Sequence, residues 1–204
     1  MVKRGYHHGN LRQALIEAAL VLIEAKGPTG FSLSEAAKHA GVTPAAVYRH
    51  FAGREDLIAA TALQGYGIFF DVMQHASQDG HLSDLAAFEA CGRAYLDFAQ
   101  KFPGHYIAMF ESGISVNYSP ELALASSNAN AILENAAERL SRHIPMEKRP
   151  PASMFSAHIW ALSHGVVELF ARNSPGTQSP YAPEDLLETG IGIYLRGLGL
   201  IEID

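Results

Sequence analysis

The sequence predicts an all-α fold of about nine helices, and three observations support this class. Apolar residues recur every three or four positions along most of the chain, which is the spacing of a helix with one buried face. No segment shows the strict alternation of apolar and polar residues that is typical of a half-buried strand. Glycine and proline cluster between the periodic segments, where they end one helix and precede the next.

The composition is that of a globular protein with one or two domains. Of its 204 residues 48% are apolar, so the chain can bury a sizeable core. No apolar run reaches the ~18 residues that span a bilayer, and the N-terminus lacks the apolar core of a signal peptide. We therefore expect a cytoplasmic protein with no membrane partner. A single cysteine, Cys91, excludes an internal disulfide and a cysteine-based zinc site.

A first helix is predicted to begin after Asn10 and to end at Lys26-Gly27-Pro28. Asn10 is a favourable N-cap, and Gln13 lies at the N3 position of a capping box. The apolar residues of this segment are Leu11, Ala14, Leu15, Ala18 and Leu22. Their spacing places them on one face, so we expect this helix to pack against the two that follow.

Two short helices joined by a glycine turn are predicted next. Ser32 and Glu35 match the Ser-x-x-Glu capping box ahead of the first of them. Gly41 ends that helix, because glycine adopts the left-handed conformation without steric cost. The second helix begins at Thr43 as N-cap, with Pro44 at the first helical position. This arrangement is typical of a helix-turn-helix, whose second helix enters the major groove of DNA.

The side chains on the exposed face favour a helix-turn-helix over a plain helical hairpin. Tyr48, Arg49 and His50 suit phosphates and base edges better than they suit a purely solvated face. We expect Arg49 to bind a guanine, and Tyr48 and Arg54 to hold phosphates. The predicted DNA contacts are Ser32, Ser34, Thr43, Pro44, Ala45, Tyr48, Arg49, His50, Arg54, Lys3 and Arg4. The last two lie in a basic arm that either reaches the DNA or is a disordered tail.

The distribution of charge agrees with DNA binding, although the net charge of −6 by itself does not. Residues 1–60 contain seven Lys and Arg against five Asp and Glu, whereas the remaining residues contain eight against sixteen. The basic end can therefore meet phosphates, while the acidic remainder keeps the protein in solution.

The pattern Gly41-Val42-Thr43-x-x-x-Val47-Tyr48-x-His50-Phe51-x-x-Arg54-x-x-Leu57 resembles the DNA-binding domain of the tetracycline-repressor (TetR) family of bacterial transcriptional regulators. The resemblance extends backward over the first helix and covers roughly residues 5–60. The family usually carries Lys at the position of Arg54, and both side chains can contact a phosphate. The resemblance implies a three-helix DNA-binding domain over residues 1–54 and a helical effector and dimerisation domain over residues 55–204.

Six further helices are predicted downstream of the helix-turn-helix. They cover residues 53–76, 83–102, 105–111, 119–143, the segment from Pro151 to 173, and 183–200. The first of these is long enough to belong to both domains. We expect it to couple them, because tilting one of its ends moves the other.

A second resemblance lies in the sequence WALSHGVVEL, which contains Trp160, His164 and Gly165. It is similar to the Trp-His-Gly C-terminal domain found in a branch of the same family, which implies dimerisation through the last two helices. Independently, Gly190, Tyr194 and Gly197 share one face of the last helix, where glycines allow close approach of two backbones. We expect this face to be the dimer seam; the alternative is packing within one subunit.

Aromatic and methionine residues are spread over the helices that should enclose the C-terminal core. A pocket among such helices, mostly apolar with a few polar groups, is the usual site for a small molecule. The candidate ligand-binding residues are Phe69, Phe70, Met73, Tyr95, Met109, Phe110, Glu111, Asn128, Trp160 and His164. The alternative is that most are ordinary core, with His164 a hydrogen-bonded core histidine.

Together these features predict a DNA-binding transcriptional regulator: a repressor that binds a palindromic operator in double-stranded DNA as a homodimer and is released by a small, lipophilic effector. The alternative is a regulator with no small-molecule pocket, controlled by a protein partner or by its own abundance. An enzyme is the rival class, but no nucleophile elbow, P-loop, dinucleotide fingerprint or His-x-x-x-His pair occurs. We therefore expect no catalytic residues, no cofactor and no metal.

Overall fold

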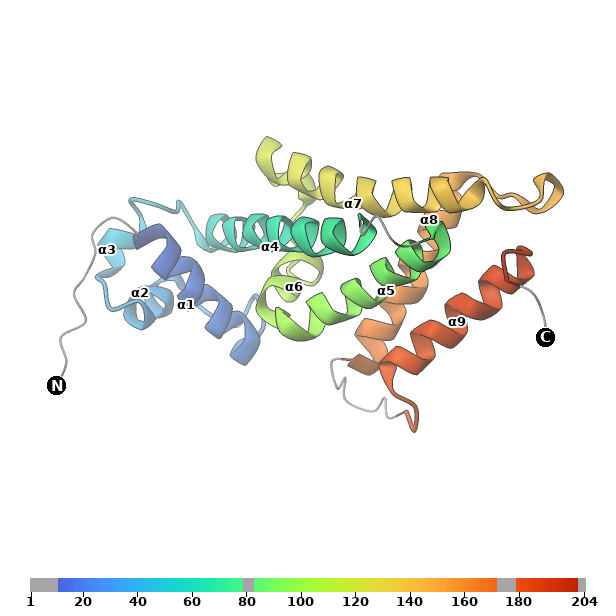
Figure 1. The fold of residues 1–204 in the computed structure, drawn as a ribbon. Helices are drawn as coiled ribbons and strands as arrows, with labels where there is room; N and C mark the ends of the chain where they lie inside the picture. Colours follow the sequence, from blue (N-terminus) through green and yellow to red (C-terminus); the bar gives the residue numbers. More distant parts are fainter. Residues whose placement is uncertain (1–10, 79–82, 172–178, 202–204) are drawn as a thin grey trace. The chain divides into compact units, whose positions relative to one another are not determined.

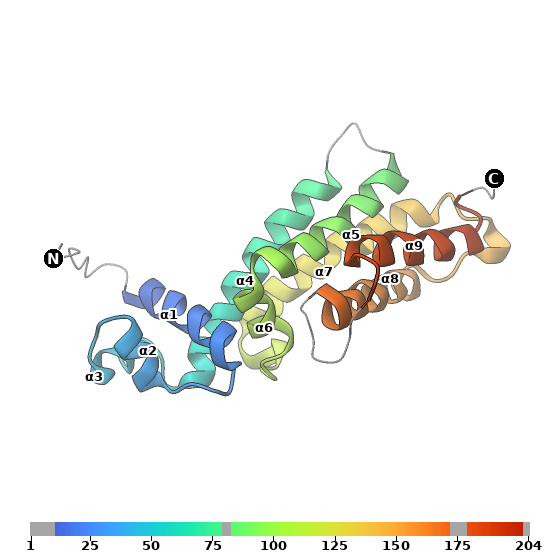
Figure 2. The same ribbon diagram turned by 90° about the horizontal axis from the view of Figure 1, so that it is seen from below.

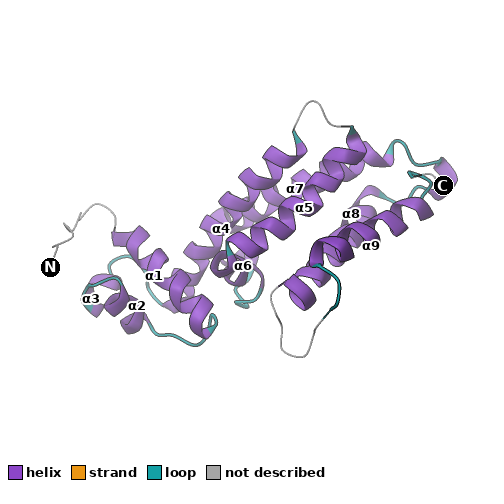
Figure 3. Ribbon diagram, turned by 60° about the horizontal axis from the view of Figure 1, so that its bottom comes forward, coloured by secondary structure: helices purple, strands orange, loops and turns teal. Residues whose placement is uncertain are grey.

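The structure is a computed structural model that describes residues 11–78, 83–171 and 179–201 (Figure 1). Within these ranges the chain forms nine α-helices and no strand (Figure 3), which confirms the predicted all-α class. Lys3, Arg4 and the predicted cap Asn10 lie outside the described residues. None of the helices in the described ranges has both the length and the apolar character needed to cross a bilayer.

The α-helices are α1 (Leu11–Lys26), α2 (Leu33–His39), α3 (Pro44–Val47), α4 (Arg54–Ser77), α5 (Asp84–Lys101), α6 (Pro103–Phe110), α7 (Pro120–Ser141), α8 (Ala152–Val166) and α9 (Pro183–Gly197). Two 3-10 turns, η1 (Val116–Tyr118) and η2 (Met146–Lys148), precede α7 and α8. A short π-helix, η3 (Val167–Ala171), continues α8. The predicted last helix therefore ends earlier than expected, at Gly197 in place of residue 200.

The chain forms two compact units. Unit 1 comprises residues 1–66 and 102–124, and unit 2 comprises residues 67–101 and 125–204. The chain passes between the units at three points. One lies between α5 and α6, and the other two fall inside α4 and α7, so each of these two helices contributes residues to both units. The sequence did not indicate that α6 belongs with the N-terminal helices. The domain boundary between residues 54 and 55 remains a prediction.

In unit 1 the capping box of α2 and the glycine turn after it form as the sequence predicted, whereas the predicted cap of α3 does not. The Ser32 hydroxyl accepts the N–H of Glu35, and the Glu35 carboxylate accepts the N–H of Ser32, which completes the capping box. Gly41 has a φ of 73°, in the left-handed region. Thr43 precedes α3 with Pro44 at its first position, but its side chain makes no capping hydrogen bond.

Helix α6 packs closely against α1 at Gly104. The backbone N–H of Gly104 donates a hydrogen bond to Glu24 Oε1 at 3.0 Å. A Cβ at this position would lie 2.8 Å from that oxygen and 3.0 Å from Leu20 Cδ2. The side chain of Gln64 bridges the same region, since its amide group lies 3.3 Å from both Gln13 Oε1 and His105 Nε2. Burial lowers the pKa of His105.

The core of unit 2 is built from aromatic side chains. Phe69 makes an edge-to-face contact with Tyr95 (5.6 Å between ring centroids) and a tilted contact with Phe98 (5.0 Å). Phe88 stacks on Phe155, which joins α5 to α8. Helix α9 lies beside α8 (Figure 2) and buries Leu187, Ile191 and Leu195, so its apolar face is covered within its own unit.

Candidate nucleic-acid interface

The predicted DNA-contacting face is exposed in the structure. Ser32 and Ser34 on α2, and Thr43 and Pro44 at the start of α3, are all accessible to solvent. The remaining accessible residues of this face are Ala45, Tyr48, Arg49 and His50. Tyr48 is 62% exposed, which is unusual for an aromatic ring with no external partner. Their role in DNA binding remains a prediction.

Small and apolar side chains hold this face in place from behind. Ala36 and Ala37 of α2 are fully buried, as is Val47 of α3. The N–H of Val42 donates to the carbonyl of Ala37 at 2.9 Å, which ties the turn to α2. The buried side chains of Ala36, Ala37 and Val47 therefore fix α3 against α2, and the exposed groups of α3 project from this packed pair of helices. Regular α-helix covers only Pro44–Val47, and Tyr48 to His50 continue it as turns.

Arg54 has a structural task that the sequence did not indicate. Its Nη1 donates to the carbonyl oxygens of Thr29 (2.9 Å) and Phe31 (3.4 Å), so the guanidinium joins the loop after α1 to the start of α4. Arg54 is half-buried, unlike the other members of the set within the described ranges. Part of this side chain is therefore used inside the protein, and only its remaining donors are available to a phosphate.

An ion pair joins the end of α1 to the start of α2. Lys26 Nζ lies 2.5 Å from Glu35 Oε1. This hydrogen bond, together with those from Ser32, lowers the pKa of Glu35 to about 2. The guanidinium of Arg12 lies 5.3 Å from the centre of the Phe51 ring, a cation–π contact between α1 and the segment that joins α3 to α4. Sequence reasoning identified Glu35 only as a cap and did not single out Arg12.

The predicted ligand-binding residues do not come together in one cavity. Phe69, Met73, Tyr95 and Trp160 line a small cavity in unit 2. Met109, Phe110 and Glu111 belong to unit 1. Glu111 is exposed, and of the three remaining residues Asn128 is exposed while Phe70 and His164 are half-buried. Neither Phe70 nor Asn128 lines the cavity.

The cavity in unit 2 is very small. It measures about 10 Å³, which is about the space that one water molecule needs. Its wall includes Cys91, whose burial raises the thiol pKa to about 11, so this cysteine stays protonated. The Tyr95 hydroxyl and His164 Nδ1 are 2.7 Å apart, and the imidazole stacks on Trp160. His164 is therefore hydrogen-bonded within the unit, as the simpler of the two interpretations predicted.

Two of the three residues of the predicted dimer seam on α9 pack within their own chain, as the alternative interpretation predicted. A Cβ at Gly190 would lie 3.1 Å from Leu162 Cδ2, so this glycine faces α8 of the same chain. The Tyr194 hydroxyl lies 2.7 Å from His158 Nδ1, and its ring stacks on Phe155. The spacing identified one face of the helix correctly, but the neighbour that covers this face is α8.

The all-α fold with an exposed helix-turn-helix defines a DNA-binding transcriptional regulator. Residues 15–61 match the family described as bacterial regulatory proteins, tetR family, and residues 88–194 match the family described as tetracyclin repressor-like, C-terminal domain. The chain belongs to the TetR family of regulators, as the helix-turn-helix pattern and the Trp-His-Gly sequence predicted.

Individual relatives agree with this assignment. The chain is 30% identical over 100 residues to the uncharacterized HTH-type transcriptional regulator YobS of Bacillus subtilis (strain 168). That alignment covers 49% of this chain and 51% of YobS, so the chain spans about half the length of the curated relative it matches. A protein of unknown function from Rhodococcus sp. RHA1 is similar in structure, with a TM-score of 0.79 and 25% identity over 96% of this chain and 99% of that one.

A third relative was solved together with DNA. AibR, in complex with isovaleryl coenzyme A and operator DNA, is similar to this chain with a TM-score of 0.66. The two are 20% identical, and the match covers 90% of this chain and 97% of AibR. At this identity the likeness establishes a shared fold, and what AibR binds is a property of AibR.

Proposed function

We propose that this regulator is a repressor that binds a palindromic operator as a homodimer. The observation that carries the proposal is the exposed row formed by Tyr48, Arg49 and His50 beyond the buried Val47. These side chains can reach base edges and phosphates once α3 lies in a major groove. The protein acts in the cytoplasm, on the nucleoid when it is bound to DNA. Residues 1–54 form the DNA-binding domain, and residues 55–204 receive the signal and dimerise.

We infer that two chains pair because a single helix-turn-helix contacts too little DNA to bind tightly. One helix-turn-helix contacts only a half-site, and two-fold pairing doubles the contacts and matches a palindrome. Gly190 and Tyr194 contact α8 of the same chain. We therefore place the dimer contact on apolar residues that remain exposed on the last two helices. Met154 on α8 is 50% exposed and Ile193 on α9 is 63% exposed. These two side chains are the proposed centre of the homodimer contact.

We further propose that a small, lipophilic ligand releases the DNA. The TetR-family membership and the AibR complex with an acyl coenzyme A and operator DNA support a ligand-responsive role. Such a ligand shifts the DNA-bound population only as far as it binds one conformation better than the other. The long helix α4 is the proposed coupling element, since it contributes to both compact units.

One observation favours the alternative, a regulator that is controlled by a protein partner or by abundance. The cavity lined by Phe69, Met73 and Tyr95 has room for about one water molecule and for no lipophilic ligand. A ligand at this place would have to open the core and displace packed aromatic rings. The internal cavity therefore gives the ligand-release proposal no support.

A mobility shift with the DNA upstream of the gene and of its neighbours tests the proposed function. We expect a folded dimer to bind a palindrome there, with an affinity that falls steeply as salt rises, because phosphate contacts release counterions. A folded dimer that binds no palindrome at moderate salt would refute the repressor proposal. Small lipophilic compounds added to the bound complex then separate the ligand-released regulator from the alternative.

A further inference from the structure

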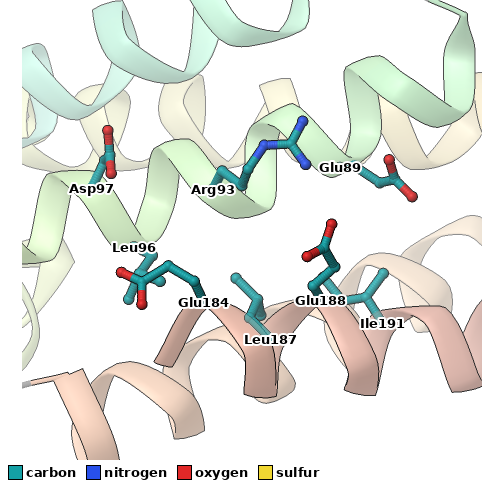
Figure 4. Close-up of a pocket in the computed structure, with 8 residues that line it drawn as sticks. All are labelled: Glu89, Arg93, Leu96, Asp97, Glu184, Leu187, Glu188 and Ile191. Carbon is teal, nitrogen blue, oxygen red and sulfur yellow. The ribbon is translucent and has the colours of Figure 1, made fainter. Parts of the chain in front are cut away.

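A second pocket lies between α5 and α9 in unit 2 (Figure 4). It measures about 120 Å³, roughly the size of cavities that hold a benzene-sized molecule. Its floor consists of Leu96 on α5 with Leu187 and Ile191 on α9, and all three are buried. The helices approach closely at Gly92, where a Cβ would lie 3.3 Å from Ile191 Cδ1. The pocket is therefore an apolar recess that widens beside a tight helix crossing.

Charged side chains surround this apolar floor. Glu89, Arg93 and Asp97 contribute from α5, and Glu184 and Glu188 contribute from α9. In Figure 4 Glu188 and Leu187 point from α9 toward α5. Four carboxylates and one guanidinium therefore line the recess.

Most of the negative charge has no compensating cation. Asp97 is paired with Lys101 at 2.7 Å, whereas no ion pair joins Glu89, Glu184 or Glu188 to a cation within the described ranges. Glu184 only accepts a hydrogen bond from the neutral side chain of Gln100, at 3.1 Å. Glu184 and Glu188 are also four residues apart on one helix, where like charges repel each other. A cation in the pocket would relieve this repulsion.

We propose that this pocket binds a small amphipathic cation, with its alkyl part on Leu96, Leu187 and Ile191 and its ammonium group among the carboxylates. Charge complementarity selects the sign of the ligand, and the enclosed volume limits its size to a small molecule. Binding at this pocket does not depend on the proposed repressor function. Only a consequence of binding for DNA affinity would rest on that function.

A substitution of Arg93 tests the sign of the ligand's charge. For a cationic ligand Arg93 is the one repulsive group of the lining, so removing its charge should strengthen binding. For an anionic ligand Arg93 would be the anchor, and removing its charge should abolish binding. The same substitution thus separates the two ligand classes by the direction of the change.

Isothermal titration calorimetry with the full chain at low ionic strength tests the proposal. The probes are hexylammonium, hexanol and hexanoate, which share one alkyl chain and differ in charge. The variants are Glu188→Gln, Glu184→Gln and Arg93→Gln. The matched control is Glu134→Gln, which makes the same charge change at an exposed position of α7 outside the pocket. Far-ultraviolet circular dichroism establishes that each variant is folded.

We expect hexylammonium to bind most tightly. Each glutamate substitution should weaken it by about two- to fivefold, as for a partly exposed charge pair. Arg93→Gln should tighten binding by a similar factor, and Glu134→Gln should leave it unchanged. Neutral hexanol should be insensitive to all four substitutions.

Three results would overturn the proposal. Hexylammonium that binds no better than hexanol would show a purely apolar recess. Hexanoate that binds most tightly, and is lost in Arg93→Gln, would show an anion site. Probe binding that appears only on dilution to the monomer would show that a second copy of the chain fills the recess. Since these measurements contain no DNA, a failed mobility shift would leave them interpretable.

Discussion

The hydroxyl of Tyr118 donates a hydrogen bond to Asp56 Oδ1 at 2.5 Å, across 62 positions of the sequence. The second oxygen of the same carboxylate accepts the backbone N–H of Ala52 at 2.8 Å. Asp56 therefore joins the turn that follows the recognition helix to the loop that precedes α7, within unit 1. The Tyr118 hydrogen bond is the main cause that lowers the pKa of Asp56, and the carboxylate in turn raises the pKa of Tyr118.

Tyr118→Phe removes this hydrogen bond and keeps the ring. We expect a loss of about 0.5–1 kcal/mol in the free energy of unfolding at neutral pH, discounted for the solvent exposure of the pair. Urea unfolding of both proteins measures it. Because the pKa of Asp56 is lowered in the folded state, the difference should persist above the unfolded pKa of about 4 and shrink as the pH falls below it. Tyr181→Phe, at an exposed tyrosine, is the control. An equal loss in both variants, or one independent of pH, would contradict the assignment.

A second acid-dependent contribution comes from Glu35. Its pKa falls to about 2 in the folded state, from an ordinary value of 4.5. The stabilisation is therefore complete above about pH 4.5 and is lost as the pH falls toward 2. In Glu35→Gln we expect a flatter dependence of the melting temperature on pH across this window. Thermal melts at several pH values measure the slope, with Glu134→Gln as the charge-matched control. A slope identical to that of the parent protein would show that the pKa of Glu35 is not lowered in the folded state.

The sequence predicted helix bounds well where both ends of the helix carry capping residues. Ser32 with Glu35 placed the start of α2, and Gly41 placed its end, because caps act over three or four residues. The long helix predicted over 53–76 was confirmed as Arg54–Ser77. Helix α6 begins at Pro103, two residues earlier than predicted, since the proline that was interpreted as a stop occupies the first turn.

Contacts between distant segments were not predictable from one sequence. The bond from Gly104 to Glu24 spans 80 positions, and the one from Tyr118 to Asp56 spans 62. Periodicity identifies a buried face but says nothing about which element covers it, and for this reason Gly190 was placed in a dimer seam when it packs against Leu162. The same limit applies to the predicted ligand pocket, because the spacing of its aromatic residues does not show which of the two units each one belongs to. The charged residues around the α5–α9 recess carried no local signal at all.

Helix α4 contains two glycines, Gly65 and Gly67, and only Gly65 is closely packed against a neighbouring helix. Substituting each by alanine therefore distinguishes the effect of close packing from that of helix propensity. A Cβ at Gly65 would lie 2.6 Å from Met109 Sδ and 3.1 Å from His105 Cβ, whereas one at Gly67 would meet nothing within 4 Å. Gly67→Ala should therefore stabilise the protein by about 0.5–1 kcal/mol through helix propensity. Gly65→Ala gains the same propensity but forces α6 to shift, which costs about 1–3 kcal/mol. Urea unfolding should place Gly67→Ala above Gly65→Ala in stability. The reverse order would mean that α6 is free to move away from α4.

The last prediction concerns how the recognition helix reads DNA. Arg49 is exposed beyond the buried Val47 and carries the planar fork that can bind O6 and N7 of a guanine. Arg49→Ala should cost about 1–3 kcal/mol on the operator and relax the preference at one base pair.

Tyr48→Phe is the comparator, because it removes only a hydroxyl from the same exposed row. If Tyr48 holds a phosphate, its loss should weaken operator and random DNA alike. Competition mobility shifts with single-base operator variants measure both effects. Arg54→Ala is unsuitable as a comparator, since it would also break the bonds to Thr29 and Phe31. Equal losses on operator and random DNA for Arg49→Ala would assign Arg49 to the phosphates, and base reading would then have to come from His50 or Thr43.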